Sequence, residues 1–353
     1  MNWVNRTLLR GDNLEFLKAM DRERVDLIYA DPPFFSQRDY GKFSDTWPSL
    51  EAYLDFMRPR LGEMRRVLKP TGSVYLHCDP TASHYLKVMM DAVFGRERFQ
   101  NEFIWYYGGG GASKSRWGRK HDVVLFYSVS DKWTFNSDAV REPHKWTRGQ
   151  VRADGSKRSS KGKLADDVWQ HHSLMPWANE RTGYPTQKPL ALLERIIKAS
   201  SNRDNLILDP FCGCATACVA AERLNRRWAG IDISPLAVKL VNDRIESDRA
   251  ATKEAEVIGF SLWGGVTALE TPPVRTDLGK LPNYRTHRHR LYGEQEGVCA
   301  GCATHFPFRV MDVDHILPRS RGGTDHPDNL QLLCSGCNRS KGGKTMAEWR
   351  ASQ

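Results

Sequence analysis

Four cysteines near the carboxyl end of the chain have the spacing of a metal site. They form two Cys-x-x-Cys pairs, Cys299 with Cys302 and Cys334 with Cys337, and 31 residues separate the two pairs. Two pairs of thiolates complete the tetrahedral coordination of zinc and leave no open position for catalysis. Unrelated buried thiols are the alternative, but two matched pairs among polar residues favour a metal. We therefore predict a structural zinc ion at these four residues.

A second pattern is typical of nucleoside binding. The apolar run at residues 206–208 ends in Asp209, a turn of small residues that includes Gly213 follows, and the run at 228–231 ends in Asp232. Ligands of parallel sheets lie at the carboxyl ends of the strands, where a small-residue turn lets them approach the backbone. A later acidic residue can then accept hydrogen bonds from ribose hydroxyls. Ordinary packing of a helix on a strand produces the same spacing, so both interpretations stay open here.

A third pattern places a carboxylate at a rigid turn. Residues 25–30 have the composition of a strand, and Asp31, Pro32 and Pro33 end it because proline cannot donate to a central hydrogen-bond ladder. The consecutive prolines fix the backbone, so the carboxylate of Asp31 and the carbonyls beside it are preorganised rather than flexible. A simple strand-ending turn is the alternative, since turns of this composition are common.

The elements that position these residues alternate between strands and helices. Strands are expected at residues 7–10, 25–30, 73–77, 102–107, 122–128, 206–209 and 228–232, and helices at 51–68, 190–199 and 215–224. This alternation predicts an α/β fold, a mostly parallel, doubly wound sheet with helices on both faces. We expect this domain at residues 1–250, a connector at 251–280 and a separate cysteine-anchored domain at 281–353.

The composition favours packed domains and a polyanionic partner. The chain has 353 residues, 40% hydrophobic and 27% charged, with a formal net charge of +10. The basic stretch at residues 141–163 holds eight cations against two acids, and Trp133, Trp146 and Trp169 lie around it. Cations bind phosphate and indoles stack on bases, so we expect a nucleic-acid-binding, target-recognition insert at about 130–180. A solvated loop is the alternative.

The sequence also indicates in which compartment the protein resides. No run of 18 apolar residues occurs, and the first residues lack the apolar core of a signal peptide. We therefore expect no membrane span and a cytoplasmic protein, in a compartment where paired cysteines more often hold zinc than disulfides. The oligomeric state stays open, with a homodimer as one possibility.

Together these patterns resemble the amino-group DNA methyltransferases that use S-adenosylmethionine and make N6-methyladenine or N4-methylcytosine. The resemblance covers residues 7–243 and is most specific in VDLIYADPPF, GYPTQKPLALLERII and LILDPFCGCATACVAAERLNRRWAGIDIS. The catalytic motif precedes the cofactor motif, with the basic insert between them, which is the order of the permuted beta class. A Rossmann-like methyltransferase sheet is implied. The family's F-x-G-x-G pattern appears at residues 211–215, with Ala215 in place of the last glycine.

The resemblance implies direct methyl transfer to an exocyclic amino group of a base flipped out of double-stranded DNA. Asp31 and the carbonyl of Pro32 would accept hydrogen bonds from that amino group, Pro33 would fix the turn, and Phe34 would stack on the base. Aspartate at the start of this motif favours adenine N6, with cytosine N4 as the alternative. The chain has no Pro-Cys dipeptide, which excludes the C5-cytosine mechanism. The residues implied in binding S-adenosylmethionine are Asp12, Lys188, Asp209, Phe211, Gly213 and Asp232.

Residues 292–342 resemble the HNH endonucleases, which implies a small zinc-stabilised ββα-metal domain. The segments DVDHILPRSRGG, DNL and CNRSKG carry this resemblance. It implies that His315 is the general base and that Asn329 orients its imidazole. Asp314 and Asn338 would hold a catalytic Mg²⁺ or Mn²⁺, although many relatives have histidine at the position of Asn338.

We therefore interpret the sequence as a bifunctional DNA enzyme, encoded by a prokaryote or a phage. One alternative is a methyltransferase whose HNH-like module is an inactive zinc domain that binds DNA. A second is a non-enzymatic DNA-binding protein that has kept a methyltransferase fold. The intact motif from Asp31 to Phe34 argues against the second alternative.

Overall fold

A computed structural model describes residues 5–41, 44–109, 113–143, 161–175, 177–178, 180–251, 266–270, 272, 275, 283–326 and 329–352. The chain divides into two compact units, Met1–Arg275 and Thr276–Gln353, and each has a hydrophobic core. Across these described ranges, none of the helices has the length and apolar character needed to cross a membrane.

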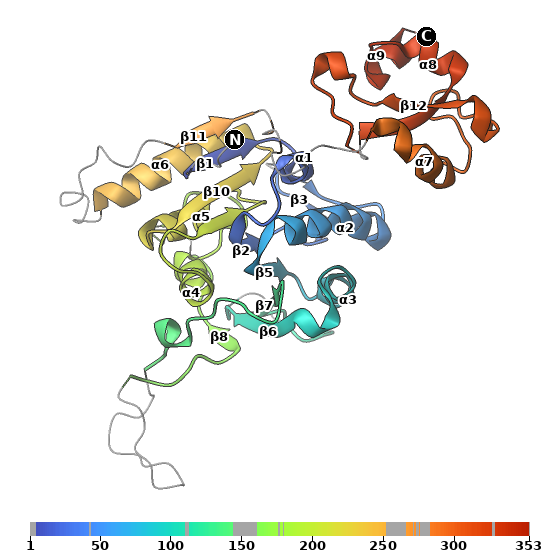
Figure 1. Cartoon of the computed structure of the whole chain (residues 1–353). Helices are drawn as coiled ribbons and strands as arrows, with labels where there is room; N and C mark the ends of the chain where they lie inside the picture. The colour runs from blue at the N-terminus through green and yellow to red at the C-terminus, as the bar shows by residue number, and fades with distance from the viewer. Residues whose placement is uncertain are drawn as a thin grey trace. The chain divides into compact units, whose positions relative to one another are not determined.

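A nine-stranded sheet forms the centre of the first unit (Figure 1). In spatial order its strands are β11 (Thr267–Leu269), β1 (Thr7–Arg10), β10 (Arg227–Asp232), β9 (Leu206–Asp209), β2 (Val25–Ala30), β5 (Leu68–Cys78), β7 (His121–Ser128), β6 (Phe99–Tyr106) and β8 (Val168–Gln170). Strand β7 runs antiparallel to its neighbours β5 and β6. The other neighbouring pairs are parallel, which confirms the mostly parallel sheet expected from the sequence.

Helices cover both faces of this sheet (Figure 1). Helices α1 (Asn13–Ala19), α2 (Leu50–Val67) and α3 (Ser83–Phe94) share one core cluster, and α4 (Leu190–Ser200), α5 (Thr216–Arg223) and α6 (Pro235–Ala251) share the other. Side chains alternate along a strand, so Ile28 enters the first cluster and its neighbour Leu27 the second. The expected doubly wound α/β fold is confirmed.

The direction of chain progression reverses between β9 and β2. These two strands pair in parallel, with Leu27 opposite Ile207. From β2 the chain continues through α2 to β5 on one side, and from β9 it continues through α5 to β10 on the other. Such a switch point leaves a crevice at the carboxyl ends of the strands, where ligands of open α/β sheets bind. Asp31 and Asp209 both lie at this edge.

Two segments differ from the sequence-based expectation. Strand β5 begins at Leu68 rather than Ser73, because Leu68 pairs with Val25 before the register shifts and pairing resumes at Ser73. This irregularity accommodates Pro70, which cannot donate to a regular ladder. Strand β11 lies inside the expected connector and pairs with β1, so this part of the connector belongs to the sheet.

The described residues of the second unit form a two-stranded antiparallel sheet and three short α-helices. Strands β12 (Met311–His315) and β13 (Leu330–Cys334) pair with each other, and α8 (Ser335–Lys341) follows directly. Helices α7 (Arg288–Glu294) and α9 (Met346–Ala351) complete the unit. The order of two strands and a helix fits the expected ββα module.

Candidate active site

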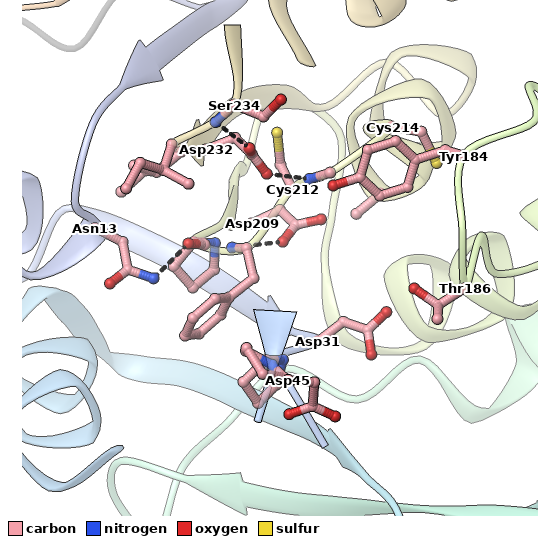
Figure 2. A pocket seen from close by; sticks show the side chains of 18 of the residues that line it. Asn13, Asp31, Asp45, Tyr184, Thr186, Asp209, Cys212, Cys214, Asp232 and Ser234 are labelled. Carbon is pink, nitrogen blue, oxygen red and sulfur yellow. Dashed lines mark hydrogen bonds between the residues drawn. The ribbon is translucent and has the colours of Figure 1, made fainter. Parts of the chain in front are cut away.

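A pocket of about 400 Å³ lies at the switch point of the sheet. This volume is within the range of small-molecule and cofactor sites. Every residue of the first unit that the sequence assigned to catalysis or to the cofactor lines this pocket. Figure 2 shows Asp232 and Ser234 at one end of the pocket, Asp31 and Asp45 at the other, and Asp209 between them.

Asp31 forms an ion pair that the sequence did not predict. The ammonium group of Lys188 donates to both carboxylate oxygens of Asp31, at 2.8 and 2.6 Å, although 157 residues separate them. Their side chains are 18% and 7% exposed, so the pair is largely shielded from water. Lys188 lines the pocket as predicted, and its ammonium group pairs with the proposed catalytic carboxylate.

Asp45, which ends the two-residue strand β4 (Ser44–Asp45), holds the turn that follows Asp31. Asp45 is only 1% exposed. Its carboxylate accepts hydrogen bonds from the backbone N–H groups of Phe34, Phe35 and Ser36, at 3.1, 2.9 and 2.7 Å. The indole of Trp47 is a fourth donor, at 3.0 Å. Hydrogen bonds to an ionised acceptor are about twice as strong as neutral ones. Asp45 therefore fixes the backbone that carries the motif from Asp31 to Phe34.

The ring of Phe34 rests on a buried polar network. It lies 5.5 Å from the ring of His77, which is fully buried. His77 hydrogen-bonds to the hydroxyl of Tyr29 at 2.7 Å and to the carboxylate of Asp122 at 3.2 Å. Burial acts to raise the pKa of Asp122, but the hydrogen bond and charge of His77 outweigh it and the pKa is lowered. This network anchors one side of the aromatic ring that was predicted to stack on a base.

At the other end of the pocket the Asp232 carboxylate organises the backbone. Its two oxygens accept the N–H groups of Gly213 and Ser234, both at 2.7 Å (Figure 2). Gly213 has a φ of +49°, and a Cβ there would lie 3.1 Å from the ring of Tyr184. Each carboxylate oxygen can accept a second hydrogen bond, so Asp232 keeps acceptor capacity toward the pocket. Burial raises the pKa of Asp232 despite these two donors.

Asp209 and Ala215 shape the turn that Gly213 occupies. Asp209 accepts the N–H of Phe211 at 3.1 Å, and burial raises its pKa well above the usual value, with the charges of Asp31 and Asp232 adding to the effect. Ala215, where the family pattern has glycine, takes the left-handed conformation at a φ of +59°. The left-handed conformation destabilises an alanine by about 1 kcal/mol. The turn therefore keeps the backbone shape of the family's glycine with a small loss of folding stability.

Asp12 forms an ion pair with Arg60, a residue that the sequence did not indicate as part of the site. Its carboxylate accepts two hydrogen bonds from Arg60, at 2.8 and 2.9 Å, and caps α1 through the N–H of Leu14. Arg60 also donates to Asn13 at 2.7 Å, and Asn13 donates to the carbonyl of Pro210 at 2.7 Å (Figure 2). This chain of contacts joins the β1 and β9 sides of the pocket.

The predicted basic surface is only partly within the described residues. Trp146 and most cations of the 141–163 stretch lie outside them. Trp169 does not present a free face, because it stacks on Phe103 at 4.0 Å and lies under Arg195 at 4.2 Å. Trp133 adjoins Thr134, whose N–H bonds to Thr71 near the amino end of β5, at the edge of the sheet opposite the pocket. Trp169 therefore has no free face for a base, whereas base stacking by Trp133, which is 37% exposed, stays a prediction.

In the second unit the four cysteines converge as predicted. The sulfurs of Cys299, Cys302, Cys334 and Cys337 all lie within 4.8 Å of one another. Tetrahedral zinc with bonds of about 2.3 Å places its sulfurs roughly 3.8 Å apart, so the cluster fits this ion. Backbone N–H groups of Gly301 and Cys334 donate to the sulfur of Cys299, at 3.3 and 3.1 Å, and so fix its position in the cluster.

The histidine predicted as general base has a different partner from the expected one. Nε2 of His315 lies 2.8 Å from Oδ1 of Asp325, and Arg319 pairs with the same carboxylate. Asn329 instead accepts the N–H of Leu317 and donates to the carbonyls of Leu317 and Thr324. Asn329 therefore braces the loop that carries Asp325, and the expectation that it orients the imidazole directly is corrected.

Asp314 is engaged by two neighbours. Its residue is 9% exposed, Gln331 donates to it at 2.9 Å, and the fully buried ammonium of Lys341 pairs with it at 3.0 Å. Asn338 lies on α8, which packs against β12, so both predicted oxygen donors for a hard cation belong to one small region. A divalent cation at Asp314 would share this carboxylate with Lys341.

Several residues in these sites went unidentified in the sequence, among them Asp45, Arg60 and Asp325. Asp45 follows Phe34 by 11 positions, and nothing in this spacing indicates that the chain folds back onto the turn. The sequence therefore gives only a weak signal that Asp45 belongs to the site. Arg60 occupies a buried position on an otherwise amphipathic helix, where an arginine needs a partner, and this was the strongest available signal.

Two family models match the chain. The model described as DNA methylase (N6_N4_Mtase) matches residues 25–243, and the one described as HNH endonuclease matches residues 299–344. The first range contains the pocket-lining residues from Tyr29 to Ser234 but not Gly11, Asp12 and Asn13, and the second contains the cysteine cluster.

Individual proteins agree with these matches. The chain is 32% identical to the type II methyltransferase M.HpaI of Haemophilus parainfluenzae over 246 residues, covering 69% of this chain and 76% of that protein. It is 30% identical to the DNA adenine methyltransferase YhdJ of Escherichia coli (strain K12), covering 68% and 83%. The solved structure of PvuII DNA methyltransferase (cytosine-N4-specific) aligns with a TM-score of 0.53 at 19% identity, over 76% of this chain and 95% of that one, which supports the fold.

Proposed function

Because the chain belongs to the DNA methylase family of N6 and N4 methyltransferases and carries an HNH endonuclease domain, we propose that it methylates the N6 amino group of adenine in double-stranded DNA. The observation that carries the proposal is the position of Asp31, at the end of β2, with its carboxylate in the switch-point pocket. We further propose that S-adenosylmethionine is the methyl donor.

The pocket suits a cationic cofactor. Five carboxyl groups line it, those of Asp12, Asp31, Asp45, Asp209 and Asp232, and the cations Arg60 and Lys188 offset only part of their charge. S-adenosylmethionine, when bound, supplies a methyl group activated by a sulfonium. Asp232 would accept hydrogen bonds from ribose hydroxyls through its remaining lone pairs, beside the turn at Gly213.

The residues after β2 would then activate the target. An exocyclic amino group is a poor nucleophile because its lone pair is delocalised into the base. Asp31 and the carbonyl of Pro32 would accept its two protons in hydrogen bonds and favour tetrahedral geometry at the nitrogen. Methylation of the nitrogen then requires loss of one proton, which Asp31 is placed to accept. The base would reach the site by leaving the helix and stacking on Phe34.

The choice of adenine rests on two supports. The motif begins with aspartate, and one relative is named a DNA adenine methyltransferase. Incubating the purified chain with isotopically labelled S-adenosylmethionine and genomic DNA, then hydrolysing the DNA for mass spectrometry, should yield N6-methyladenine. N4-methylcytosine as the labelled product would contradict the base assignment, and no labelled base would contradict the proposed activity.

The turn that carries Asp31 should depend on Asp45. Replacing Asp45 with asparagine leaves buried N–H groups without enough acceptors, and the displaced turn should lower kcat for methyl transfer by about 10- to 100-fold. Affinity for S-adenosylmethionine, measured by calorimetry, should change by less than about threefold because Asp45 lies at the opposite end of the pocket from Asp232. The matched control is Asp39→Asn on the neighbouring strand β3 (Arg38–Asp39), where the acid is exposed. Equal kinetics in the Asp45 and Asp39 variants would contradict this role.

We also propose that the HNH domain cleaves DNA with Mg²⁺ or Mn²⁺. The donors Asp314 and Asn338 offer hard oxygen atoms, which these cations prefer. The ammonium of Lys341 reduces the negative charge at Asp314, so we expect weak, readily exchanged metal. Asp325 accepts Nε2–H of His315, which leaves Nδ1 as the atom that takes a proton from water.

The hydrogen bond between His315 and Asp325 predicts that replacing Asp325 with asparagine strongly lowers DNA nicking. Asp325→Asn can donate to Nε2 and so select the imidazole tautomer that carries its proton on Nδ1. Nicking of a supercoiled plasmid should fall by about 10²- to 10⁴-fold, as expected when a general base is held in the wrong tautomer. Zinc content and melting temperature should match the parent, and parental nicking by Asp325→Asn would contradict the pairing.

A further inference from the structure

One loop beside the pocket carries an indole that packing does not explain. Trp117 is 96% exposed, the largest exposed fraction of any large hydrophobic side chain in the described parts of the chain. Burial of an aromatic side chain usually contributes strongly to stability. An indole left almost entirely in water therefore contributes little to the packing of the first unit. A single exposed ring needs no partner by itself, so its role is inferred from the charged groups around it.

The loop lies at the edge of the sheet where the pocket opens. Residues 113–120 lead directly into β7, which runs antiparallel to β5 and begins where β5 ends, with Cys78 opposite Val123. Asp122 bonds to His77, whose ring packs on Phe34. Trp117 precedes Asp122 by five positions in the sequence. The Cα atoms of the two residues therefore lie at most about 18 Å apart.

The side chains around Trp117 are cationic. The 113–120 loop contains Lys114, Arg116, Arg119 and Lys120 and no acid. Arg119 contacts Asp79 at 3.3 Å, and Lys120 bonds to the carbonyl of Gly109. For Lys114 and Arg116 no ion pair occurs among the residues that the structure describes. Cations that flank an aromatic ring match a nucleic acid strand, in which phosphates alternate with stacked bases.

We propose that Trp117 inserts into the DNA duplex and fills the space that the extruded target base leaves. The inference rests on the proposed function, because it needs a base that leaves the helix for the site at Asp31. Extrusion breaks a base pair and two stacking contacts, and an inserted indole restores stacking with the neighbouring bases. Lys114 and Arg116 would hold the backbone of the opened duplex close to the indole.

Three further tryptophans among the described residues fit this role less well. Trp169 is packed between Phe103 and Arg195, and Trp133 lies at the opposite edge of the sheet. Trp177 is 79% exposed, but its described neighbours Met175, Ala178 and Glu180 bring no cation next to it. Trp133→Ala is therefore a matched control that removes an indole far from the pocket, and Trp177→Ala tests the competing position.

The test compares two DNA substrates in buffer without added divalent cations. Both contain the recognition sequence, first identified by sequencing DNA that the parent has methylated. In one the target base is paired, and in the other it lies opposite an abasic site, so that little stacking and no pairing must be broken. The full-length parent, Trp117→Ala, Trp117→Phe, Trp133→Ala and Trp177→Ala are measured on both.

Trp117→Ala should lower kcat/KM on the paired substrate by about 10- to 100-fold and remain within about threefold of the parent on the abasic substrate. Trp117→Phe should recover part of the loss, and Trp133→Ala should match the parent on both. Equal losses of Trp117→Ala on the two substrates, no loss on either, or the selective profile in Trp177→Ala instead would overturn the assignment. A parent that methylates neither substrate would refute the proposed function, which is a separate result.

Discussion

Replacing Asp31 with alanine is expected to lower kcat for methyl transfer by at least about 10³-fold while the Kd for S-adenosylmethionine stays within about threefold of the parent. The carboxylate serves the amino group of the target base, whereas the cofactor contacts expected at Gly213 and Asp232 lie at the far end of the pocket (Figure 2). Single-turnover methylation at saturating DNA measures the first quantity, and calorimetry with S-adenosylmethionine measures the second. Lost cofactor affinity in a folded variant would contradict this division.

The ion pair with Lys188 complicates this variant and also supplies its control. Removing one partner of a shielded pair leaves an uncompensated charge, which typically costs about 3–5 kcal/mol. Asp31→Ala should therefore melt at a lower temperature than the parent. Adding Lys188→Met removes the stranded charge and should recover much of the melting temperature without recovering methyl transfer. Activity that returns together with stability would show that Asp31 serves only to neutralise the charge of Lys188.

Local patterns were sufficient to predict the sheet and the turns that line the pocket. The strands that end at Ala30, Asp209 and Asp232 are short apolar runs closed by proline, acidic or small residues, and such signals need no knowledge of the rest of the chain. Because parallel strands end at one edge, placing them in one sheet also placed their acids near one another. Strand β5 was predicted too short for a local reason, since Pro70 and Gly72 read as a break although an irregular pairing carries the strand past them.

The contacts that make the turn rigid could not be predicted in this way. Lys188 reaches Asp31 across 157 residues, so only the assembled sheet brings them together. Asp45 belongs to a two-residue strand, which is too short to show a periodicity in the sequence, and its four donors become apparent only when the chain folds back on the turn. Asp325 presents the same difficulty beside His315. Sequence patterns identify the acting groups, whereas the residues that hold them depend on loop geometry.

In the second unit, Cys337→Ser is expected to remove zinc and unfold the domain. The described core of this unit is small, with buried side chains that include Leu291, Met311 and Leu332, and two of its buried residues are themselves cysteines of the cluster. Binding of structural zinc contributes about 10–16 kcal/mol in small zinc domains, and this energy is largely folding energy. Zinc content should fall from one ion per chain toward none, and limited proteolysis should digest the region after Thr276.

The contrast with His315→Ala tests whether zinc and catalysis are separate in this domain. His315 does not belong to the cysteine cluster, and its ring contacts Asp325 and Tyr284. His315→Ala should therefore keep one zinc ion, the parental proteolysis pattern and parental methyl transfer, while DNA nicking with Mg²⁺ or Mn²⁺ is lost. Cys337→Ser should lose nicking as well, but through unfolding, and should also keep methyl transfer because the pocket lies within the Met1–Arg275 unit.

A Cys337→Ser protein that retains zinc and resists protease would contradict the structural role of the cluster. Nicking by His315→Ala at the parental rate would instead refute the assignment of the general base, and neither result would alter the expectations for Asp31.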